Sequence, residues 1–299
     1  MVFNPLNLDD VSGYQNWRDS KLRAYDCGQN KKIVELAHLE LADAELESIV
    51  SSCNSFNYCL YRLSDPLIGS KSFVRNMGLA LGLRRLDGNL CSDEDNISSI
   101  QVRDTGRNSG YIPYTDKKLT WHTDGYYNSE ERTIHGMVLH CVRPAQSGGE
   151  NLMLDHEMAY IQLRDENPDY VSVFMQPDVL TIPPNIENNV EIRGAQSGPV
   201  FSLESSSGRL HMRYSARTRN IEWKNEGLTN EAVACMSELL STNNPYVITY
   251  RLQAGEGIIA NNVLHNRTEF TDSEIEEQKR LLYRARYYDR VGKVSGHKS

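Results

Sequence analysis

Long apolar runs are absent from this 299-residue chain. No stretch approaches the roughly 20 apolar residues that a membrane-spanning helix needs. The first twenty residues are polar and acidic, without the basic start and apolar centre of a signal peptide. These absences predict a cytoplasmic protein with no membrane partner. The formal net charge of −8 also argues against a general affinity for nucleic acid or anionic lipid, because both are negatively charged.

Cysteine motifs and common hydrolase motifs are absent as well. The six cysteines form no CxxC pair, and their spacing matches neither a disulfide framework nor a zinc site. We therefore expect free thiols in a reducing compartment. The chain contains no GxSxG and no HExxH segment, which disfavours serine hydrolases and metallohydrolases.

No repeat, low-complexity tract or linker interrupts the chain, which predicts one catalytic domain over 1–299. Within it we expect a mostly helical N-terminal decoration over 1–108, a core over 109–290 and a polar tail over 291–299. Apolar spacing predicts helices over 36–50, 70–83, 156–174 (interrupted near Asn167-Pro168) and 226–240, and an irregular segment over 92–107. Short strands are predicted over 136–142, 151–154, 179–182, 200–203, 209–214, 246–252, 257–260 and 280–288. The predicted fold is mainly β with α, a double-stranded β-helix (jelly roll) with flanking helices.

The segment WHTDG at 121–125 contains the most informative side chains. His122 and Asp124 are two residues apart, so on a strand they face the same way. Two histidines and one carboxylate form the metal site of non-haem Fe(II) oxygenases, and His265 is the best candidate for the third ligand. A lone HxD is a weak pattern. The rival His38-Leu39-Glu40 is discounted because it falls in a predicted helix, where positions i and i+2 point apart.

The remaining histidines are expected to have hydrogen-bonded structural roles, apart from His297 in the polar tail. An arginine pattern near the C-terminus adds a second kind of site. Arg280, Arg284 and Arg286 have the same parity, so on a strand they share one face. Buried guanidinium groups need anions, which would be a diacid, a substrate acid group or carboxylates of the protein itself. The sequence leaves these alternatives open.

Four segments occur in an order that resembles a known family. They are WHTDG, PAQSGGENLMLD, NNVLHNR and KRLLYRARYYD, and the resemblance covers about 110–290. The chain resembles the taurine dioxygenase-like (TauD/TfdA) superfamily of Fe(II)- and 2-oxoglutarate-dependent dioxygenases. The HC…SGGE pattern echoes the γ-butyrobetaine hydroxylase branch, and HTDG with RLLYRARYYD echoes the glutarate hydroxylase branch.

The resemblance implies roles for the metal candidates. His122, Asp124 and His265 would bind Fe(II), and no catalytic residue beyond these ligands is implied. Because halogenases of this fold replace the carboxylate ligand with a small residue, the presence of Asp124 favours hydroxylation or desaturation.

The resemblance also implies a cosubstrate site. Arg280 would bind the distal carboxylate of 2-oxoglutarate, and Arg284 matches a position that binds the substrate acid in the taurine enzyme. Branches differ in which arginine has which role, so Arg284 is a candidate for either role and Arg286 for the substrate. Asn151 stands where the taurine enzyme has a cosubstrate-binding threonine, and its amide can still donate a hydrogen bond.

The predicted function is oxidation of a small polar, acid-bearing metabolite with 2-oxoglutarate and O₂ as cosubstrates. The alternative is a non-catalytic jelly-roll sensor that binds a metal or ligand. Tyr126, one of four tyrosines flanking the metal motif, is a candidate for contacting the substrate, although packing is the alternative. Arg217 and Arg219 either bind an anion or are solvated loop charges. We expect a small-molecule substrate, no nucleic-acid partner and a possible homo-oligomer.

Overall fold

The computed structural model describes residues 3–64, 69–88, 92–103, 111–241 and 243–292. Its contacts divide the chain into two compact units that alternate along the sequence. The first unit comprises Met1–Cys27, Thr120–Thr133 and Leu154–Val247, and the second comprises Gly28–Leu119, Ile134–Met153 and Ile248–Ser299. Among the described residues, no helix is long and apolar enough to cross a membrane.

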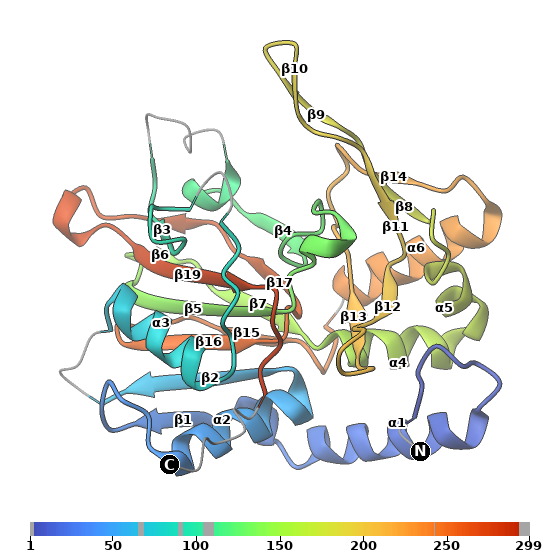
Figure 1. Ribbon diagram of the computed structural model, residues 1–299, viewed down its shortest axis with the longest axis horizontal. Coiled ribbons are helices and arrows are strands. Elements are labelled where there is room, and N and C mark those ends of the chain that lie inside the picture. The colour runs from blue at the N-terminus through green and yellow to red at the C-terminus, as the bar shows by residue number, and fades with distance from the viewer. Residues whose placement is uncertain (1–2, 65–68, 89–91, 104–110, 242, 293–299) are drawn as a thin grey trace. The chain divides into compact units, whose positions relative to one another are not determined.

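The second unit is built around a six-stranded sheet with the order β1-β2-β16-β5-β19-β3 (Figure 1). Its strands are β1 (Ile33–Leu36), β2 (Tyr58–Leu63), β16 (Glu256–Ala260), β5 (Gly136–Arg143), β19 (Leu281–Tyr287) and β3 (Ser98–Ile100). All neighbouring pairs are antiparallel except β1 with β2. A side chain at Gly257 would bring its Cβ to 2.3 Å from the Tyr61 ring and 2.5 Å from the Leu139 carbonyl oxygen, so only glycine fits there.

A four-stranded sheet with the order β15-β7-β17-β4 contains strands from both ends of the core. Its strands are β15 (Ile248–Tyr250), β7 (Asn151–Leu154), β17 (Leu264–Arg267) and β4 (Leu119–His122). A further short pair joins β6 (Ser147–Gly148) to β18 (Phe270–Thr271). Strand β17 is therefore flanked by β7 and β4, which bear two other predicted site residues.

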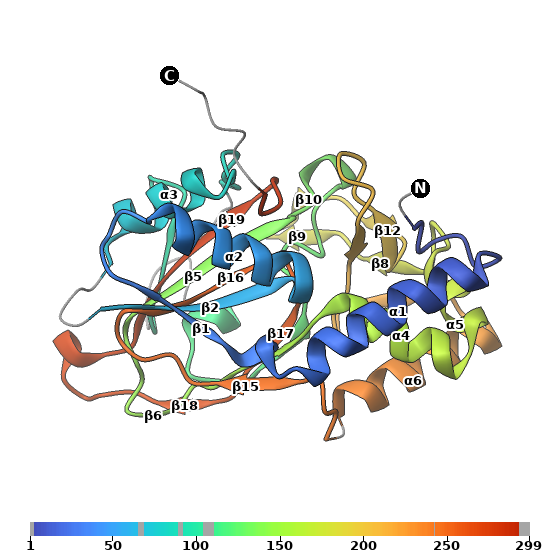
Figure 2. The ribbon, with the colours of Figure 1, turned by 90° about the horizontal axis from the view of Figure 1, so that it is seen from below.

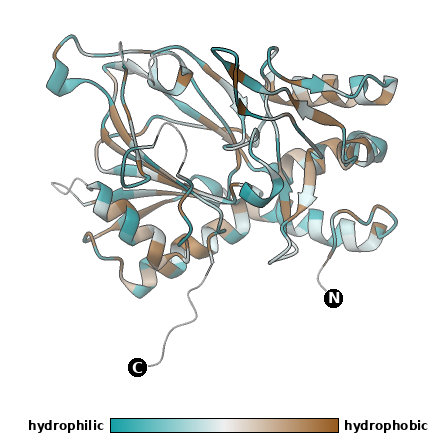
Figure 3. Ribbon diagram, turned by 45° about the horizontal axis from the view of Figure 1, so that its top comes forward, coloured by the Kyte–Doolittle hydropathy of each residue, from teal (hydrophilic) through white to brown (hydrophobic). Residues whose placement is uncertain are grey.

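Helices α2 (Asp43–Phe56) and α3 (Lys71–Ala80) cover one face of the six-stranded sheet (Figure 2). Val50, Cys53, Val74 and Met77 pack with sheet residues such as Ile259 in one buried cluster. Because this cluster removes a large apolar surface from water, it stabilises this unit. Hydrophobic residues concentrate in strands and helices, whereas the connecting loops are mostly hydrophilic (Figure 3).

The first unit contains α1 (Val11–Asp26), α4 (His156–Glu166), α5 (Pro168–Phe174) and α6 (Gly227–Ser241). Its strands form three small sheets: β11 (Gln196–Gly198), β8 (Leu180–Ile182) and β14 (Glu222–Trp223); β12 (Phe201–Leu203) with β13 (Leu210–Met212); and the hairpin of β9 (Asn185–Glu187) with β10 (Val190–Arg193). Lys21 in α1 lies 2.6 Å from carboxylate oxygens of both Asp155 and Glu157, and all three side chains are buried. This cluster fixes α1 to the start of α4.

Several predicted elements are confirmed. Helix α3 begins after Ser70, whose hydroxyl accepts a hydrogen bond from the Phe73 amide at 3.4 Å. The predicted interruption at Asn167-Pro168 separates α4 from α5. Helix α6 and the strands expected between 136 and 288 are present, most of them one to four residues shorter than predicted.

The helix predicted over 36–50 is wrong in its first half. Residues Ile33–Leu36 form β1, and α2 begins at Asp43 because the Glu45 carboxylate accepts from the Ala42 amide at 2.7 Å. His38 and Glu40 are therefore exposed and outside any helix, so the stated reason for discounting them is incorrect. Helix α1 and strands β1, β2 and β3 were not predicted. His297, most of the predicted tail and 104–107 of the predicted irregular segment lie outside the described residues.

Short 3-10 turns complete the described elements, at Gln29–Lys31, Ile112–Tyr114, Glu130–Arg132 and Glu276–Gln278.

Candidate metal centre

The backbone around His122 is held by a short antiparallel bridge to the residues that follow β13. The Ala216 amide donates to the Trp121 carbonyl at 2.8 Å, and the Thr123 amide donates to the Tyr214 carbonyl at 3.0 Å. The Thr123 hydroxyl in turn accepts from the Tyr214 amide at 3.1 Å. The bonds on both sides of His122 restrict the direction in which its side chain leaves the chain.

Asp124 lies in the turn after β4 and not on the strand itself, as the two-residue spacing had predicted, but its side chain still lies near that of His122. Its Oδ1 atom is 3.9 Å from Nε2 of His122, and both side chains are buried. The chain turns directly after it, because Gly125 adopts φ 68°, which glycine reaches without steric cost. His122 is thus the last residue of β4, and Asp124 lies in the turn that follows it.

His265 lies in β17, beside β4 in the four-stranded sheet. Its Nδ1 is 2.9 Å from the Val263 carbonyl oxygen, and Nδ1 of His122 is 2.8 Å from the Thr120 carbonyl oxygen. A ring nitrogen facing a carbonyl oxygen carries the proton, so we assign the lone pair of each ring to Nε2. Metal-binding histidines are oriented in the same way.

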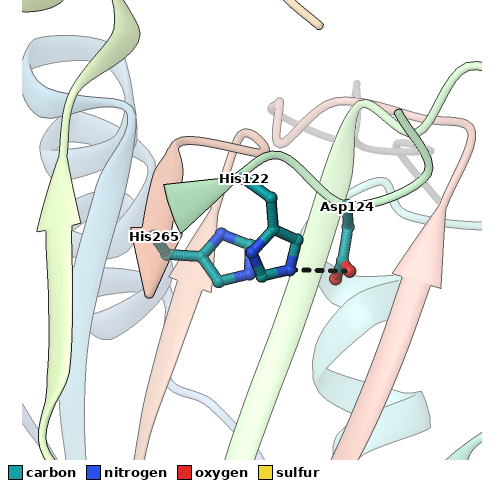
Figure 4. A group of neighbouring side chains, drawn as sticks. All are labelled: His122, Asp124 and His265. Carbon is teal, nitrogen blue, oxygen red and sulfur yellow. Dashed lines mark ion pairs between the residues drawn. The ribbon is translucent and has the colours of Figure 1, made fainter. Parts of the chain in front are cut away.

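The structure brings His122, Asp124 and His265 together (Figure 4). One ligand atom from each lies within 4.8 Å of the others. Within the described ranges, no other group of three histidine, cysteine or acidic side chains meets this condition. Two imidazoles and one carboxylate match the donor set that binds Fe(II) in oxygenases and leaves coordination positions open.

A hollow adjoins His265 within the second unit. Its walls come from strands of both larger sheets and include three of the predicted cosubstrate and substrate residues. It is lined by Ile100, Pro113, Leu119, Met137, Leu139, Asn151, His265, Asn266, Arg267, Arg280, Leu282 and Arg284. The apolar members would exclude water, while the polar members would orient a charged ligand.

Arg280 is the most isolated cation in this hollow. Its side chain is 5% exposed and lies over the Phe270 ring, 4.9 Å from the ring centre. Among the described residues, no acceptor contacts its guanidinium group, and burial lowers the pKa of Arg280 to about 10. The amide nitrogen of Asn151, which lines the same hollow, is also buried without a described acceptor. A carboxylate would satisfy both groups.

Arg284 and Arg286 have different surroundings, although they share a strand face. Arg284 lines the hollow. Arg286 is buried in an ion pair with the buried carboxylate of Asp87, and it does not line the hollow. For Arg286 the protein supplies the anion, so the alternative of a structural ion pair describes it better than contact with substrate.

Sequence reasoning missed Arg267. Its guanidinium donates to the carbonyl of Thr115 at 2.8 Å and to the carbonyl of Lys117. Burial, reinforced by the positive charge of Arg280, lowers the pKa of Arg267 to about 9. Arg267 thereby ties the strand of His265 to the segment that leads into β4. The i, i+2 spacing from His265 was the only signal in the sequence.

The tyrosines near the metal motif do not have one common role. The Tyr114 side chain is 2% exposed, which agrees with packing. The Tyr126 ring lies edge-on to the His122 ring with centres 6.4 Å apart, and the Tyr127 ring lies 5.2 Å from that of Tyr126. Among Tyr114, Tyr126 and Tyr127, it is therefore Tyr126 that lies directly beside a candidate ligand.

The family model described as taurine catabolism dioxygenase TauD, TfdA family matches residues 63–286. The chain belongs to this family. Two curated relatives, both named uridine-5'-phosphate dioxygenase, are 28% identical over 199 residues (Amycolatopsis sp.) and 29% identical over 205 residues (Streptomyces sp.). These matches cover 64% of this chain and 67% of the first relative, and 66% and 71% for the second.

Solved structures show the same fold at low sequence identity. Asparagine oxygenase in complex with Fe(II), 3-hydroxyasparagine and succinate has a TM-score of 0.54 at 16% identity and covers 91% of each chain. The non-haem iron oxygenase OrfP, in complex with a hydroxyarginine, has a TM-score of 0.60 at 14% identity and covers 84% of this chain and 81% of its own. The predicted family and enzyme class, a 2-oxoglutarate-dependent iron dioxygenase, are confirmed.

Proposed function

We propose that His122, Asp124 and His265 bind the Fe(II) of this dioxygenase and that the adjoining hollow binds 2-oxoglutarate. The observation that carries the proposal is the convergence of three ligand atoms within 4.8 Å. It is supported by the two Nδ1 contacts to backbone carbonyls, which leave Nε2 of each histidine as the ligand atom.

We also infer that the two larger sheets form a jelly roll. The chain passes from β3 in the six-stranded sheet to β4 in the four-stranded sheet, back to β5, and then to β7 and β15. It then returns to β16, crosses to β17 and ends in β19. This alternation, with β3-β19-β5-β16 and β4-β17-β7-β15 as the two strand orders, is expected when eight strands fold as a double-stranded β-helix.

The hollow fits one end of a dicarboxylic acid. We assign the distal carboxylate of 2-oxoglutarate to the Arg280 guanidinium and the Asn151 amide, because both are buried donors with no described acceptor. Arg284 adds a second cation at the same wall. A bidentate guanidinium contact would fix the direction of the diacid, so that its 2-oxo acid end lies toward His265.

The protein's own contribution is orientation and shielding. Bound Fe(II) supplies the capacity to activate O₂ with 2-oxoglutarate as reductant, which releases succinate and CO₂. The carbonyls of Thr120 and Val263 hold the two imidazoles with Nε2 toward the metal position. Arg267 fixes the strand of His265 to the segment before β4, and the apolar wall, which includes Met137 and Leu139, limits the entry of water.

The substrate we propose is a small polar metabolite that bears an acid group and is hydroxylated or desaturated. Two groups of similar proteins support this choice of substrate. The curated relatives are named for a nucleoside 5'-monophosphate, and the similar solved structures include oxygenases of asparagine and arginine derivatives. Nucleoside 5'-monophosphates are therefore the first compounds to test, and polar amino acids the second.

The test is substrate-dependent release of succinate from 2-oxoglutarate by the Fe(II)-loaded protein in air. We expect at least one nucleoside monophosphate or amino acid to accelerate release, and Asp124→Ala to abolish the acceleration. Asp43→Ala is the matched control. Asp43 is exposed in the first turn of α2, and its replacement removes the same charge.

Stimulated release that persists in Asp124→Ala would overturn the assignment of the ligands. No stimulation by any compound, while Fe(II) and 2-oxoglutarate both bind, would contradict the proposed substrate classes.

A further inference from the structure

Three arginines surround the two tyrosines that follow Asp124, and all of them lie in the first unit. Arg213 is the innermost. Its guanidinium donates to the backbone carbonyls of Tyr126 at 2.7 Å, Gln196 at 2.8 Å and Leu180 at 2.9 Å. These acceptors are neutral, so they satisfy its hydrogen bonds and leave its positive charge uncompensated.

Arg193, the last residue of β10, is the second cation. Its guanidinium donates to the carbonyls of Pro183 at 2.7 Å and Gly194 at 2.8 Å. It also lies near Tyr126 and Tyr127. Like Arg213, it is held by neutral oxygens and adds positive potential beside the two phenol rings.

Arg217 is the third cation, and it is the one with an exposed side chain. Its Nη1 donates to the Tyr126 hydroxyl at 3.2 Å. Because Tyr126 lies edge-on to His122, this bond holds the Arg217 cation at the turn that contains Asp124. Arg219, two residues later, is exposed and its side chain makes no hydrogen bond or ion pair with the described residues. The structure thus separates two arginines that the sequence left equivalent.

The cluster has no counter-ion in the described part of the chain. None of the three guanidinium groups lies within ion-pair distance of a described carboxylate, although the chain contains 40 acidic residues. Three cations near Tyr126 without a paired carboxylate create a positive potential that favours the binding of an anion. A phosphate monoester carries about −1.5 to −2 charges at pH 7, so it compensates more of this charge than a carboxylate or a sulfonate does.

We propose that Arg217 and Tyr126 form a subsite for the phosphate group of a phosphate-monoester substrate. Arg217 donates the charged hydrogen bonds and the Tyr126 hydroxyl orients its guanidinium, while Arg193 and Arg213 supply positive potential. The location beside His122 places the phosphate end of the substrate next to the metal position. This inference rests on the proposed function, because it concerns the substrate of the same site.

The experiment uses calorimetric titration of the full chain, loaded anaerobically with Fe(II) and 2-oxoglutarate. The titrants are inorganic phosphate, uridine 5'-phosphate, uridine and taurine. The variants are Arg217→Gln, Arg217→Lys, Tyr126→Phe and the control Arg219→Gln, which removes an equal charge from the same loop.

We expect phosphate and uridine 5'-phosphate to bind the wild type, and uridine and taurine to bind at least tenfold more weakly than uridine 5'-phosphate. Arg217→Gln should lower the affinity for both phosphate ligands at least tenfold. Arg217→Lys and Tyr126→Phe should lower this affinity by a smaller factor. Arg219→Gln should change it less than twofold. Binding of phosphate directly to the metal would not depend on Arg217.

Equal affinities of Arg217→Gln and Arg219→Gln for the phosphate ligands would overturn the proposal. Taurine binding as tight as that of uridine 5'-phosphate would also overturn it, as would no binding of either phosphate ligand to the wild type. If the loaded protein retains its Fe(II) and 2-oxoglutarate in these measurements, only the subsite fails. If it cannot be loaded, the proposed function itself fails.

Discussion

Replacing Arg280 by methionine should abolish tight binding of 2-oxoglutarate without weakening the fold. Arg280 is buried and has no described acceptor for its guanidinium group, and it lies over the ring of Phe270. Methionine keeps an unbranched chain against that ring and removes the charge. The variant therefore separates the electrostatic role of Arg280 from its packing role.

The size of the affinity loss follows from the burial of the site. Removing one partner of a buried charge pair costs about 3–5 kcal/mol, which corresponds to a roughly 100- to several-thousand-fold rise in the Kd of 2-oxoglutarate. Without ligand the buried charge destabilises the folded protein, because burial lowers the pKa of Arg280 from 12.5 to about 10. That shift corresponds to about 3 kcal/mol of unfavourable free energy in the fold.

The sign of the stability effect depends on pH. Below pH 10 the arginine is charged in both the folded and unfolded states, so the folded state bears the whole cost, and the cost disappears as pH rises from about 10 to 12.5. At pH 7 the cosubstrate-free Arg280→Met protein should therefore be at least as stable as the wild type, by up to about 3 kcal/mol.

The assay is an anaerobic titration of the Fe(II)-loaded protein with 2-oxoglutarate, together with urea unfolding of the cosubstrate-free protein. Arg143→Met is the control, because the Arg143 guanidinium donates to the Lys279 carbonyl and lies outside the hollow. A Kd within threefold of the wild type in Arg280→Met would refute the reasoning, and Arg284 would become the first candidate for the clamp. A large loss of stability would refute the claim that the buried charge destabilises the folded protein.

Three further predictions concern other parts of the molecule. Asp124→Ala should lower turnover at least a thousandfold. The free energy of unfolding of the metal-free protein in urea should change by less than about 1 kcal/mol. Asp87→Asn should lower the unfolding free energy in urea by about 3–5 kcal/mol, because it leaves the buried Arg286 without its carboxylate. Burial lowers the pKa of His140 from 6.5 to about 4, so this group should cost up to about 3 kcal/mol of stability as pH falls from 6.5 to 4. In urea unfolding across that pH range, the free energy of unfolding should fall less steeply in His140→Gln than in the wild type.

The local part of the metal site was predictable from the sequence, whereas its long-range part needed the resemblance. Two-residue spacing predicted His122 and Asp124 on one strand face, whereas in the structure β4 ends at His122 and the following turn brings Asp124 near it. His265 is 143 positions after His122 in the chain, and no local rule says that β17 pairs beside β4. The orientation of each imidazole by a backbone carbonyl also depends on the folded backbone.

The errors have a common physical cause, which is pairing between distant segments. Apolar residues over 36–50 have helical spacing, but parallel pairing with β2 places Leu36 at the end of β1, and 37–42 connect this strand to α2. Parity correctly placed Arg284 and Arg286 on one strand face, yet only the fold shows that Asp87, 199 residues earlier, neutralises Arg286. Arg267 was missed because its acceptors are backbone carbonyls, which leave no trace in the sequence.

The most direct test of the metal assignment is the visible spectrum of the metal-free protein during anaerobic addition of Fe(II) and then 2-oxoglutarate. We predict a weak charge-transfer band that requires both additions and is absent from Asp124→Ala and His265→Ala. Such a band would show that the 2-oxo acid chelates iron held by these residues. No band in the wild type, with Fe(II) and 2-oxoglutarate each shown not to bind, would contradict the account.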